Sequence, residues 1–167
     1  MRTTLLALAS VLAASGCMSM GAPADMTPED RAGYTAIAAS SDLFEIQSSQ
    51  IAVSKAQRPE VRQFAQMMIS HHTQTTAALM AAATASGMSP PQPALMPAQR
   101  EMIDALQRAS GASFDRVYMS QQVPAHEMAL ALHQNYAARG DAAPLRGAAT
   151  AAVPIVRQHL EQARTLD

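Results

Sequence analysis

Hydrophobic and polar residues recur along the chain, from residue 28 onward, with the three- and four-residue steps of amphipathic helices. Proline and glycine interrupt this pattern and mark the predicted boundaries. We predict a first helix that begins at Pro28, is capped by Thr27 and ends at about Gln57. A second helix is predicted from Pro59 to about Gly87, because proline suits the first helical position and glycine the end.

The rest of the pattern predicts three further helices. A proline-rich loop over residues 88–97 leads into a short helix over residues 98–109. A long helix follows, capped by Ser113 and ending near Arg139, and a last helix runs from Asp141 to the C-terminus. No strand-like alternation competes with these segments. We therefore expect an all-α fold, a ferritin-like four-helix bundle with one extra short helix in the long crossover.

The inward stripes of the long helices contain polar residues. His72 lies in the apolar seam of the second helix, and His159 lies in the seam of the last one. In the first helix, Glu45 flanks an apolar stripe made of Ile37, Phe44 and Ile51. In the long third helix, one stripe consists of Asp115, Tyr118, Gln122, His126 and His133. Three helices thus place a histidine at an inward face, and the fourth places a carboxylate there.

Histidine and glutamate side chains that project from facing helices form metal sites in four-helix bundles. Imidazole binds Zn, Cu or Fe, so a divalent transition metal is the cofactor this pattern suggests. The Glu-x-x-His signature of diiron proteins is absent, since neither His72 nor His126 has a Glu three residues earlier. A seam histidine can also hydrogen-bond a neighbour and fix the helix register. Both interpretations of Glu45, His72, Asp115, His126 and His159 stay open: a metal site, or a structural polar core.

Other chemistry has weaker support in the sequence. Successive helical residues point about 100° apart, so His71 cannot face inward together with His72 and is predicted at the bundle edge. The run Met67-Met68-Ile69-Ser70-His71-His72 suggests a copper or haem box, but Met68 also fits ordinary core packing. Ser113 has no paired base, and no glycine-rich phosphate loop is present. The pattern therefore favours a protein that is not an enzyme.

The N-terminus has the features of an export signal over residues 1–16. Arg2 supplies a positive charge, and the apolar segment that follows is too short to cross a bilayer. The run Ala14-Ser15-Gly16-Cys17 resembles a lipobox, and Cys17 is the only cysteine in the chain. We expect a lipid on Cys17 that anchors the protein in a membrane, a flexible tether over residues 17–27 and a single helical domain over residues 28–167.

The residue after Cys17 is Met18 rather than Asp, which favours an outer membrane lipoprotein facing the periplasm. The alternative is an ordinary secretory signal and release into the periplasm. The net charge of −1 and the absence of a basic run argue against nucleic acid and anionic lipid surfaces as partners. Aromatic residues make up 4% of the chain while Met occurs 12 times, a composition that suits closely packed helices.

Three ordered motifs resemble those of domain-of-unknown-function family 4142, ferritin-like proteins of the bacterial envelope often labelled as outer membrane proteins. They are Phe64-Ala65-x-Met67-Met68-Ile69-Ser70-His71-His72-Thr73, then Phe114-Asp115-Arg116-x-Tyr118 with Gln122 and His126, then Val153-Pro154 with His159-Leu160. The resemblance spans about residues 28–166, and implies the ferritin-like bundle and an envelope location. It marks Glu45, His72, Asp115, His126 and His159. The family has Asp where this chain has His71, so a carboxylate beside the site is lost.

Two functions follow from these observations. The first is an envelope-anchored, non-enzymatic module that acts in the periplasm, in stress tolerance or envelope maintenance, with its histidines in a structural core. The second is a metal-binding or redox protein that uses His72, His126, His159 and Glu45. The metal hypothesis requires at least three of these side chains to converge within about 4–5 Å of a common point, given ligand distances of about 2 Å.

Overall fold

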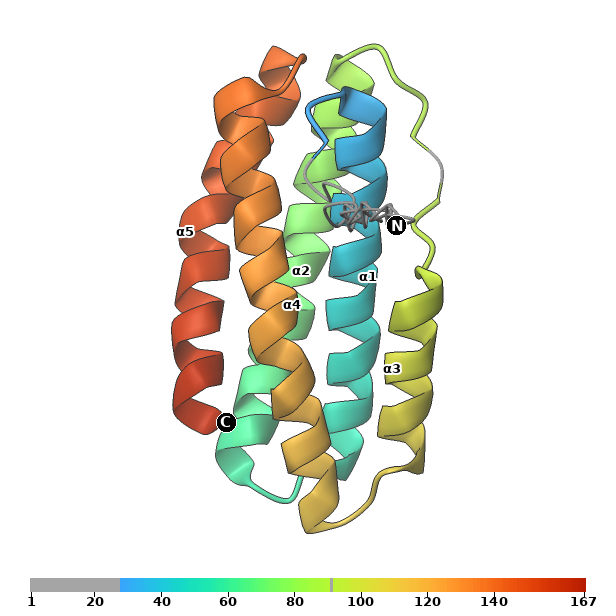
Figure 1. The fold of residues 1–167 in the computed structure, drawn as a ribbon, viewed down its shortest axis with the longest axis vertical. Coiled ribbons are helices and arrows are strands. Elements are labelled where there is room, and N and C mark those ends of the chain that lie inside the picture. The colour runs from blue at the N-terminus through green and yellow to red at the C-terminus, as the bar shows by residue number, and fades with distance from the viewer. Residues whose placement is uncertain (1–27, 91) are drawn as a thin grey trace, which may run out of the picture.

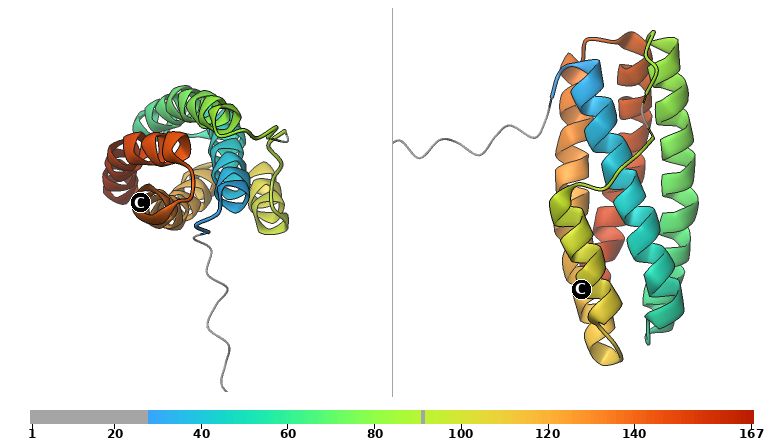
Figure 2. Two further views of the ribbon diagram at one scale, coloured as in Figure 1. Left: turned by 90° about the horizontal axis from the view of Figure 1, so that it is seen from above. Right: turned by 90° about the vertical axis from the view of Figure 1, so that its right-hand side faces the viewer.

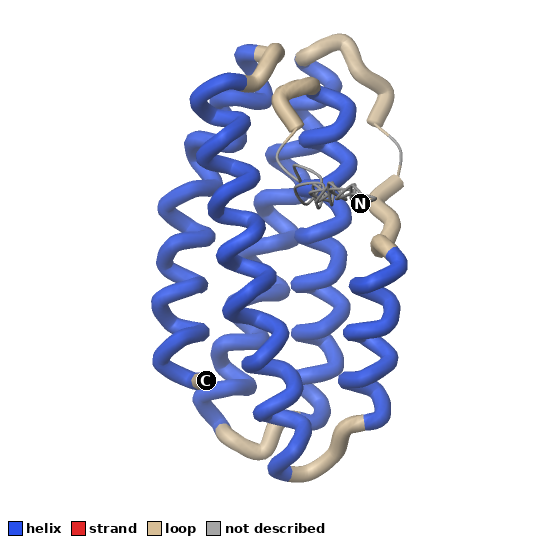
Figure 3. The backbone as a smooth tube through the Cα atoms, in the orientation of Figure 1, coloured by secondary structure: helices blue, strands red, loops and turns tan. Residues whose placement is uncertain are grey.

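The computed structural model describes residues 28–90 and 92–167, and these residues form helices joined by short loops (Figure 3). The predicted signal peptide, Cys17 and the tether lie outside this range. The described helices are α1 (Arg31–Lys55), α2 (Pro59–Ala85), α3 (Pro97–Arg108), α4 (Ala112–Arg139) and α5 (Ala143–Leu166). No strand occurs within the described range, so the all-α prediction is confirmed.

Four helices, α1, α2, α4 and α5, form the bundle, and the short α3 packs outside it against α1 and α4 (Figures 1 and 2). Around the bundle the order is α1, α2, α5, α4, and each helix runs antiparallel to both neighbours. The crossover from α2 to α4 contains α3, as the sequence predicts. Of the helices described, none combines the length and apolarity that a membrane span requires.

The start of the first helix differs from the prediction. The helix begins at Arg31, and Pro28 precedes it in a non-helical conformation. Asp30 is the N-cap, because its side chain accepts a hydrogen bond of 2.8 Å from the backbone N–H of Gly33. The prediction that Pro28 is the first helical residue was therefore wrong. The predicted cap, Thr27, lies outside the described residues.

Two later helix starts also differ from the prediction. Ser113 does not cap α4 but lies inside it, because the helix begins at Ala112. The residue before it, Gly111, has a φ of 55°, a left-handed conformation that glycine adopts without a steric penalty. The last helix begins at Ala143, two residues after the predicted Asp141. The predicted end of α2 at glycine is close to the structure, in which Gly87 follows the helix with a φ of 78°.

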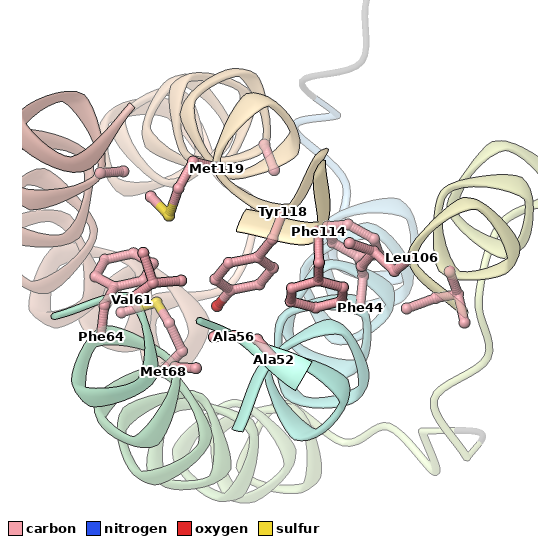
Figure 4. Packing of buried hydrophobic residues seen from close by; sticks show 14 residues of the cluster. Phe44, Ala52, Ala56, Val61, Phe64, Met68, Leu106, Phe114, Tyr118 and Met119 are labelled. Atoms are coloured by element: carbon pink, nitrogen blue, oxygen red, sulfur yellow. The ribbon is translucent and has the colours of Figure 1, made fainter. Parts of the chain in front are cut away.

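The core of the bundle consists of two apolar clusters at different heights. One cluster, drawn in Figure 4, includes large side chains from four helices: Phe44, Phe64, Met68, Leu106, Phe114, Tyr118 and Met119. The upper cluster contains Tyr34, Leu79, Leu132, Tyr136 and Leu145. Burying one such side chain contributes about 1.5–3 kcal/mol to folding. The two clusters hold the helices at fixed heights, and each bundle helix passes from one cluster to the other through a polar level between them.

Candidate metal centre

Three histidines meet at this polar level, each from a different helix. His72 of α2, His126 of α4 and His159 of α5 are 3%, 1% and 0% exposed. Each offers one ring nitrogen such that the three nitrogens lie within 4.8 Å of one another. The rings are 5.2–5.8 Å apart between centroids, with no parallel stacking among them. The structure therefore brings together three of the five residues that the sequence selected.

Helix α1 faces the histidines with a seam of small and polar residues. This seam follows three- and four-residue steps through Thr35, Ala38, Asp42, Glu45, Ser49 and Ala52, all of which are buried. The predicted apolar stripe is correct only at Phe44, because Ile37 and Ile51 are half-buried. The seam brings two carboxylates, Asp42 and Glu45, to the level of the histidines.

The outer nitrogens of His72 and His126 are held by groups that can only accept a hydrogen bond. Nδ1 of His72 lies 2.8 Å from Oδ1 of Asp42, and Nδ1 of His126 lies 2.8 Å from the backbone carbonyl oxygen of Gln122. Both Nδ1 atoms must therefore carry a proton and donate it. In the neutral rings this leaves the lone pair on Nε2, which is buried and has no hydrogen-bond partner in either residue. Metal-binding histidines are commonly oriented by such partners.

Asp42 is itself fixed by two hydroxyl groups of α2. Thr75 and Thr76 donate to its second oxygen, Oδ2, over 3.0 and 2.9 Å. Its carboxylate thus binds three side chains of one helix, which sets both its orientation and that of His72. Asp42 was not among the residues selected from the sequence, because the search for an apolar stripe on the first helix passed over its polar seam.

His159 is oriented by a fourth histidine. Its Nε2 lies 2.8 Å from Nδ1 of His71, and the two rings stack with centroids 5.1 Å apart at an angle of 18°. His71 is half-buried, which agrees with its predicted place at the bundle edge. The chain therefore lacks a carboxylate at position 71 but has an imidazole there that contacts the cluster.

The inner atoms of the cluster have no hydrogen-bond partner. Among the described residues, the buried side-chain atoms without one are Nε2 of His72 and His126, Nδ1 of His159, both carboxylate oxygens of Glu45, and the amide oxygens of Gln121 and Gln122. An unpaired buried polar group costs about 1–3 kcal/mol, so such groups are rare in folded proteins. Three of these atoms belong to the histidines whose ring nitrogens lie within 4.8 Å of one another, so this group is a candidate ligand site.

Glu45 lies beside the triad rather than within it. Its Oε1 is 4.0 Å from Nδ1 of His126, the nitrogen that donates to the backbone of Gln122. Burial raises the pKa of Glu45 above its usual value, although the nearby His126 and His72 act in the opposite direction. A cation bound by the histidines would favour the ionised form of this carboxyl group.

Burial affects the protonation of two of the histidines differently. Burial, together with the charges of His72, His126 and His71, lowers the pKa of His159 to about 2, so its ring is neutral at pH 7. Burial also acts to lower the pKa of His72. The hydrogen bond and charge of Asp42, with the charge of Glu45, outweigh it and raise that pKa above 6.5. A proton on His72 would therefore compete with a metal ion.

Asp115 does not reach the cluster, although the sequence selected it. Its two carboxylate oxygens accept from the backbone N–H groups of Gln57 and Arg58 over 3.0 and 2.9 Å, at the start of α2. It precedes His126 by 11 residues of the same helix, which is about 16 Å along the axis. Asp115 lies in the inward stripe of α4 because its carboxylate binds the backbone of Gln57 and Arg58, which connect α1 to α2.

A cavity of about 210 Å³ opens between α2 and α5 beside the cluster. Alanines form much of its wall, and Tyr34, Asp42 and His133 lie among its lining residues. The three triad histidines do not line it. The cavity thus reaches the carboxylate that orients His72, but not the converging nitrogens.

Comparisons with known proteins agree with this fold. The family model described as Domain of unknown function (DUF4142) matches residues 15–166. Solved structures of CopM superpose well: the Cu(II)-bound form has a TM-score of 0.68 at 17% identity, covering 81% of this chain and 94% of that chain. The Ag-bound form has a TM-score of 0.67 at 19% identity, and the match covers 81% of this chain and 93% of that chain. The apo form has a TM-score of 0.66 at 18% identity, and the match covers 81% of this chain and 94% of that chain. Among curated proteins, none matches the chain.

Proposed function

We propose that this chain, which belongs to the DUF4142 family, binds a transition-metal ion through His72, His126 and His159. The observation that carries the proposal is the convergence of three buried imidazole rings, each of which has one nitrogen without a hydrogen-bond partner. Nitrogens that bind one ion at about 2 Å cannot lie more than about 4 Å apart. A separation of up to 4.8 Å therefore needs side-chain movements of only about 1 Å or less.

The donor set and its surroundings favour a borderline or soft metal. Neutral imidazole suits Cu, Zn, Fe and Ni better than Mg or Ca, which prefer oxygen ligands. The structural likeness to CopM, which has been solved with Cu(II), Cu(I) and Ag, supports testing copper first. Asp42 and Glu45 lie close enough to balance the charge of a buried cation. Their contribution would be charge and orientation, while the three imidazoles supply the bonds.

The proposal keeps the envelope location that the sequence predicts. A lipid on Cys17 would hold the metal-binding bundle at the outer membrane, facing the periplasm, and binding rather than catalysis would be its role. Labelling with a radioactive fatty acid tests the anchor: the wild-type protein should incorporate label, and Cys17→Ser should not. Equal labelling of the two proteins would contradict lipidation at Cys17, and the metal proposal would stand without it.

A paired substitution on α4 tests the metal site. We expect His126→Gln to abolish stoichiometric binding of copper, as measured by elemental mass spectrometry after dialysis. His133→Gln is the matched control, because His133 is a buried histidine of the same helix that lies outside the triad. Wild type and this control should each retain one ion. An ion at 100 times its dissociation constant adds about 2.7 kcal/mol of stability, so melting curves provide a second measurement.

Either of two results would count against the proposal. The first is a wild-type protein that binds no Cu, Zn, Fe or Ni and shows no rise in melting temperature. The second is an equal amount of metal bound by His126→Gln and His133→Gln, which would place the ion elsewhere.

A further inference from the structure

His71 differs in one respect from the other groups that hold the triad histidines. The carboxylate of Asp42 and the carbonyl of Gln122 can only accept a hydrogen bond, so they fix the tautomers of His72 and His126. An imidazole nitrogen can either donate or accept. The 2.8 Å contact between Nδ1 of His71 and Nε2 of His159 therefore allows two arrangements of the protons.

The two arrangements leave His159 with different chemistry. If Nδ1 of His71 donates, Nε2 of His159 accepts, and the proton of the neutral His159 ring lies on Nδ1. That nitrogen is buried without a hydrogen-bond partner, and it then has no lone pair for a metal. If Nδ1 of His71 accepts instead, Nε2 of His159 carries the proton and Nδ1 has its lone pair free. Only the second arrangement completes a set of three donor nitrogens.

We infer that His71 is a positioning residue that accepts a hydrogen bond from Nε2 of His159, so that the ion is bound by Nδ1 of His159 and by Nε2 of His72 and His126. This inference rests on the proposed function and specifies the donor atoms of that same site. The proton of His71 then lies on Nε2. Because His71 is half-buried, a partner such as water can reach this N–H at the edge of the bundle.

Nitrogen NMR with Ag(I) as the probe tests the donor atoms directly. Silver is diamagnetic with a nuclear spin of one half, so each nitrogen that binds it shows a coupling. In the ¹⁵N-labelled, Ag(I)-loaded protein we expect this coupling at Nδ1 of His159 and at Nε2 of His72 and His126. His71 should show a protonated Nε2 and no coupling. Coupling at Nε2 of His159 would overturn the inference.

Substitutions at position 71 separate an acceptor from a mere packing residue. In His71→Asn, the amide oxygen stands at the same distance along the side chain as Nδ1 and can accept the bond, so Ag(I) affinity should stay within about threefold of wild type. His71→Leu removes the acceptor and should weaken Ag(I) binding by about 10–100-fold, the usual effect of losing such a partner. The metal-free melting temperatures of the two variants should be similar. Gln66→Leu, on the exposed surface of α2, is the matched control and should bind as wild type.

The outcomes distinguish this inference from the function on which it rests. Wild-type affinity in His71→Leu, or equal losses in His71→Leu and His71→Asn, would overturn the acceptor role while leaving a metal site in place. A wild-type protein that binds neither Ag(I) nor copper would contradict the proposed function and the inference together.

Discussion

His126 and His133 lie seven residues apart on α4 and are both buried, but their surroundings differ. Nδ1 of His133 is 3.0 Å from the hydroxyl group of Tyr34, whose ring stacks on Tyr136 in the upper apolar cluster. His126 donates from one nitrogen to the backbone, its other nitrogen has no hydrogen-bond partner, and its ring lies beside two more histidines. His133 is thus bonded within the core, whereas His126 has a ring nitrogen that the fold leaves unpaired.

This difference shows how to separate structural from functional histidines in a bundle. Burial alone does not, since both residues are almost inaccessible. A structural histidine has its bonds satisfied within the protein, which lowers the free energy of the folded state. The triad pairs only one nitrogen of each ring and leaves the other without a hydrogen-bond partner, an arrangement that costs stability in the absence of a ligand.

The largest expected effect is the loss of folding stability at acid pH that the buried His133 causes. Burial lowers the pKa of His133 from 6.5 to about 4, so the unfolded chain takes up a proton at a higher pH than the folded one. The stability this group contributes is fully present above pH 6.5 and is lost as the pH falls from 6.5 to 4. The loss is at most about 3 kcal/mol. Urea unfolding of the metal-free protein at pH 7.5 and 4.5 should show a smaller pH dependence in His133→Gln than in wild type. An unchanged pH dependence would mean that His133 does not stay neutral in the fold.

A second prediction concerns Asp42, the carboxylate that orients His72. We expect Asp42→Ala to weaken copper binding by about 10–100-fold, because His72 loses the acceptor that fixes its ring. Asp115→Ala is the matched control, since Asp115 is an equally buried carboxylate that bonds the backbone at the start of α2. That variant should lose stability but keep its copper affinity in competition titrations. Equal affinities for Asp42→Ala and Asp115→Ala would contradict the role of Asp42.

A third prediction compares the stability effects of replacing two buried histidines, His133 and His159, by leucine. His133→Leu should lower the free energy of unfolding of the metal-free protein by about 1–3 kcal/mol, because the Tyr34 hydroxyl group loses its partner. His159→Leu removes an unpaired buried nitrogen, and the hydrogen-bond partner that it takes away belongs to the half-buried His71, so it should change that free energy by less than about 1 kcal/mol, or raise it. Chemical denaturation without metal measures both. If His159→Leu were the more damaging substitution, the triad would be a structural network rather than a ligand site.

The smallest expected effect concerns charge. Glu45 does not lie within the triad, so it should act on the ion through its field. We expect Glu45→Gln to reduce affinity for Cu(II) by about tenfold. Affinity for Ag(I) should fall only about threefold, because the Coulomb energy scales with the charge of the ion. Titrations of both ions into the wild-type protein and the variant give the loss of affinity for each ion. A larger loss for Ag(I) than for Cu(II) would indicate that Glu45 acts by some means other than charge.

Much of the fold follows from the sequence, because proline and glycine mark helix ends and periodic residues mark inward faces. The long helices, the short crossover helix and the inward positions of His72, His126 and His159 were all predicted in this way. The stripes were less reliable in detail. Ile37 and Ile51, assigned with Phe44 to the apolar stripe of the first helix, are only half-buried, since a stripe defines an angle around the helix but not which neighbour covers it.

The convergence of the histidines could not be predicted from the sequence alone. Periodicity gives the direction of a side chain around its helix, whereas the height of that residue in the bundle depends on loop lengths and on how the two apolar clusters align the helices. Asp115 shares the inward stripe of His126 but lies in the first turn of α4, near one end of the bundle, whereas His126 lies at mid-helix. Asp42 was missed because hydrophobic periodicity cannot detect a seam of small and polar residues.

The most direct test of the account is a crystal structure of the copper-loaded protein with anomalous diffraction measured at the copper edge. We predict one strong anomalous peak at about 2 Å from Nε2 of His72, Nε2 of His126 and Nδ1 of His159, with Asp42, Gln122 and His71 still bonded to the outer nitrogens. A peak at a surface residue or near the N-terminal methionines, with the three histidines bonded to one another or to water, would contradict it.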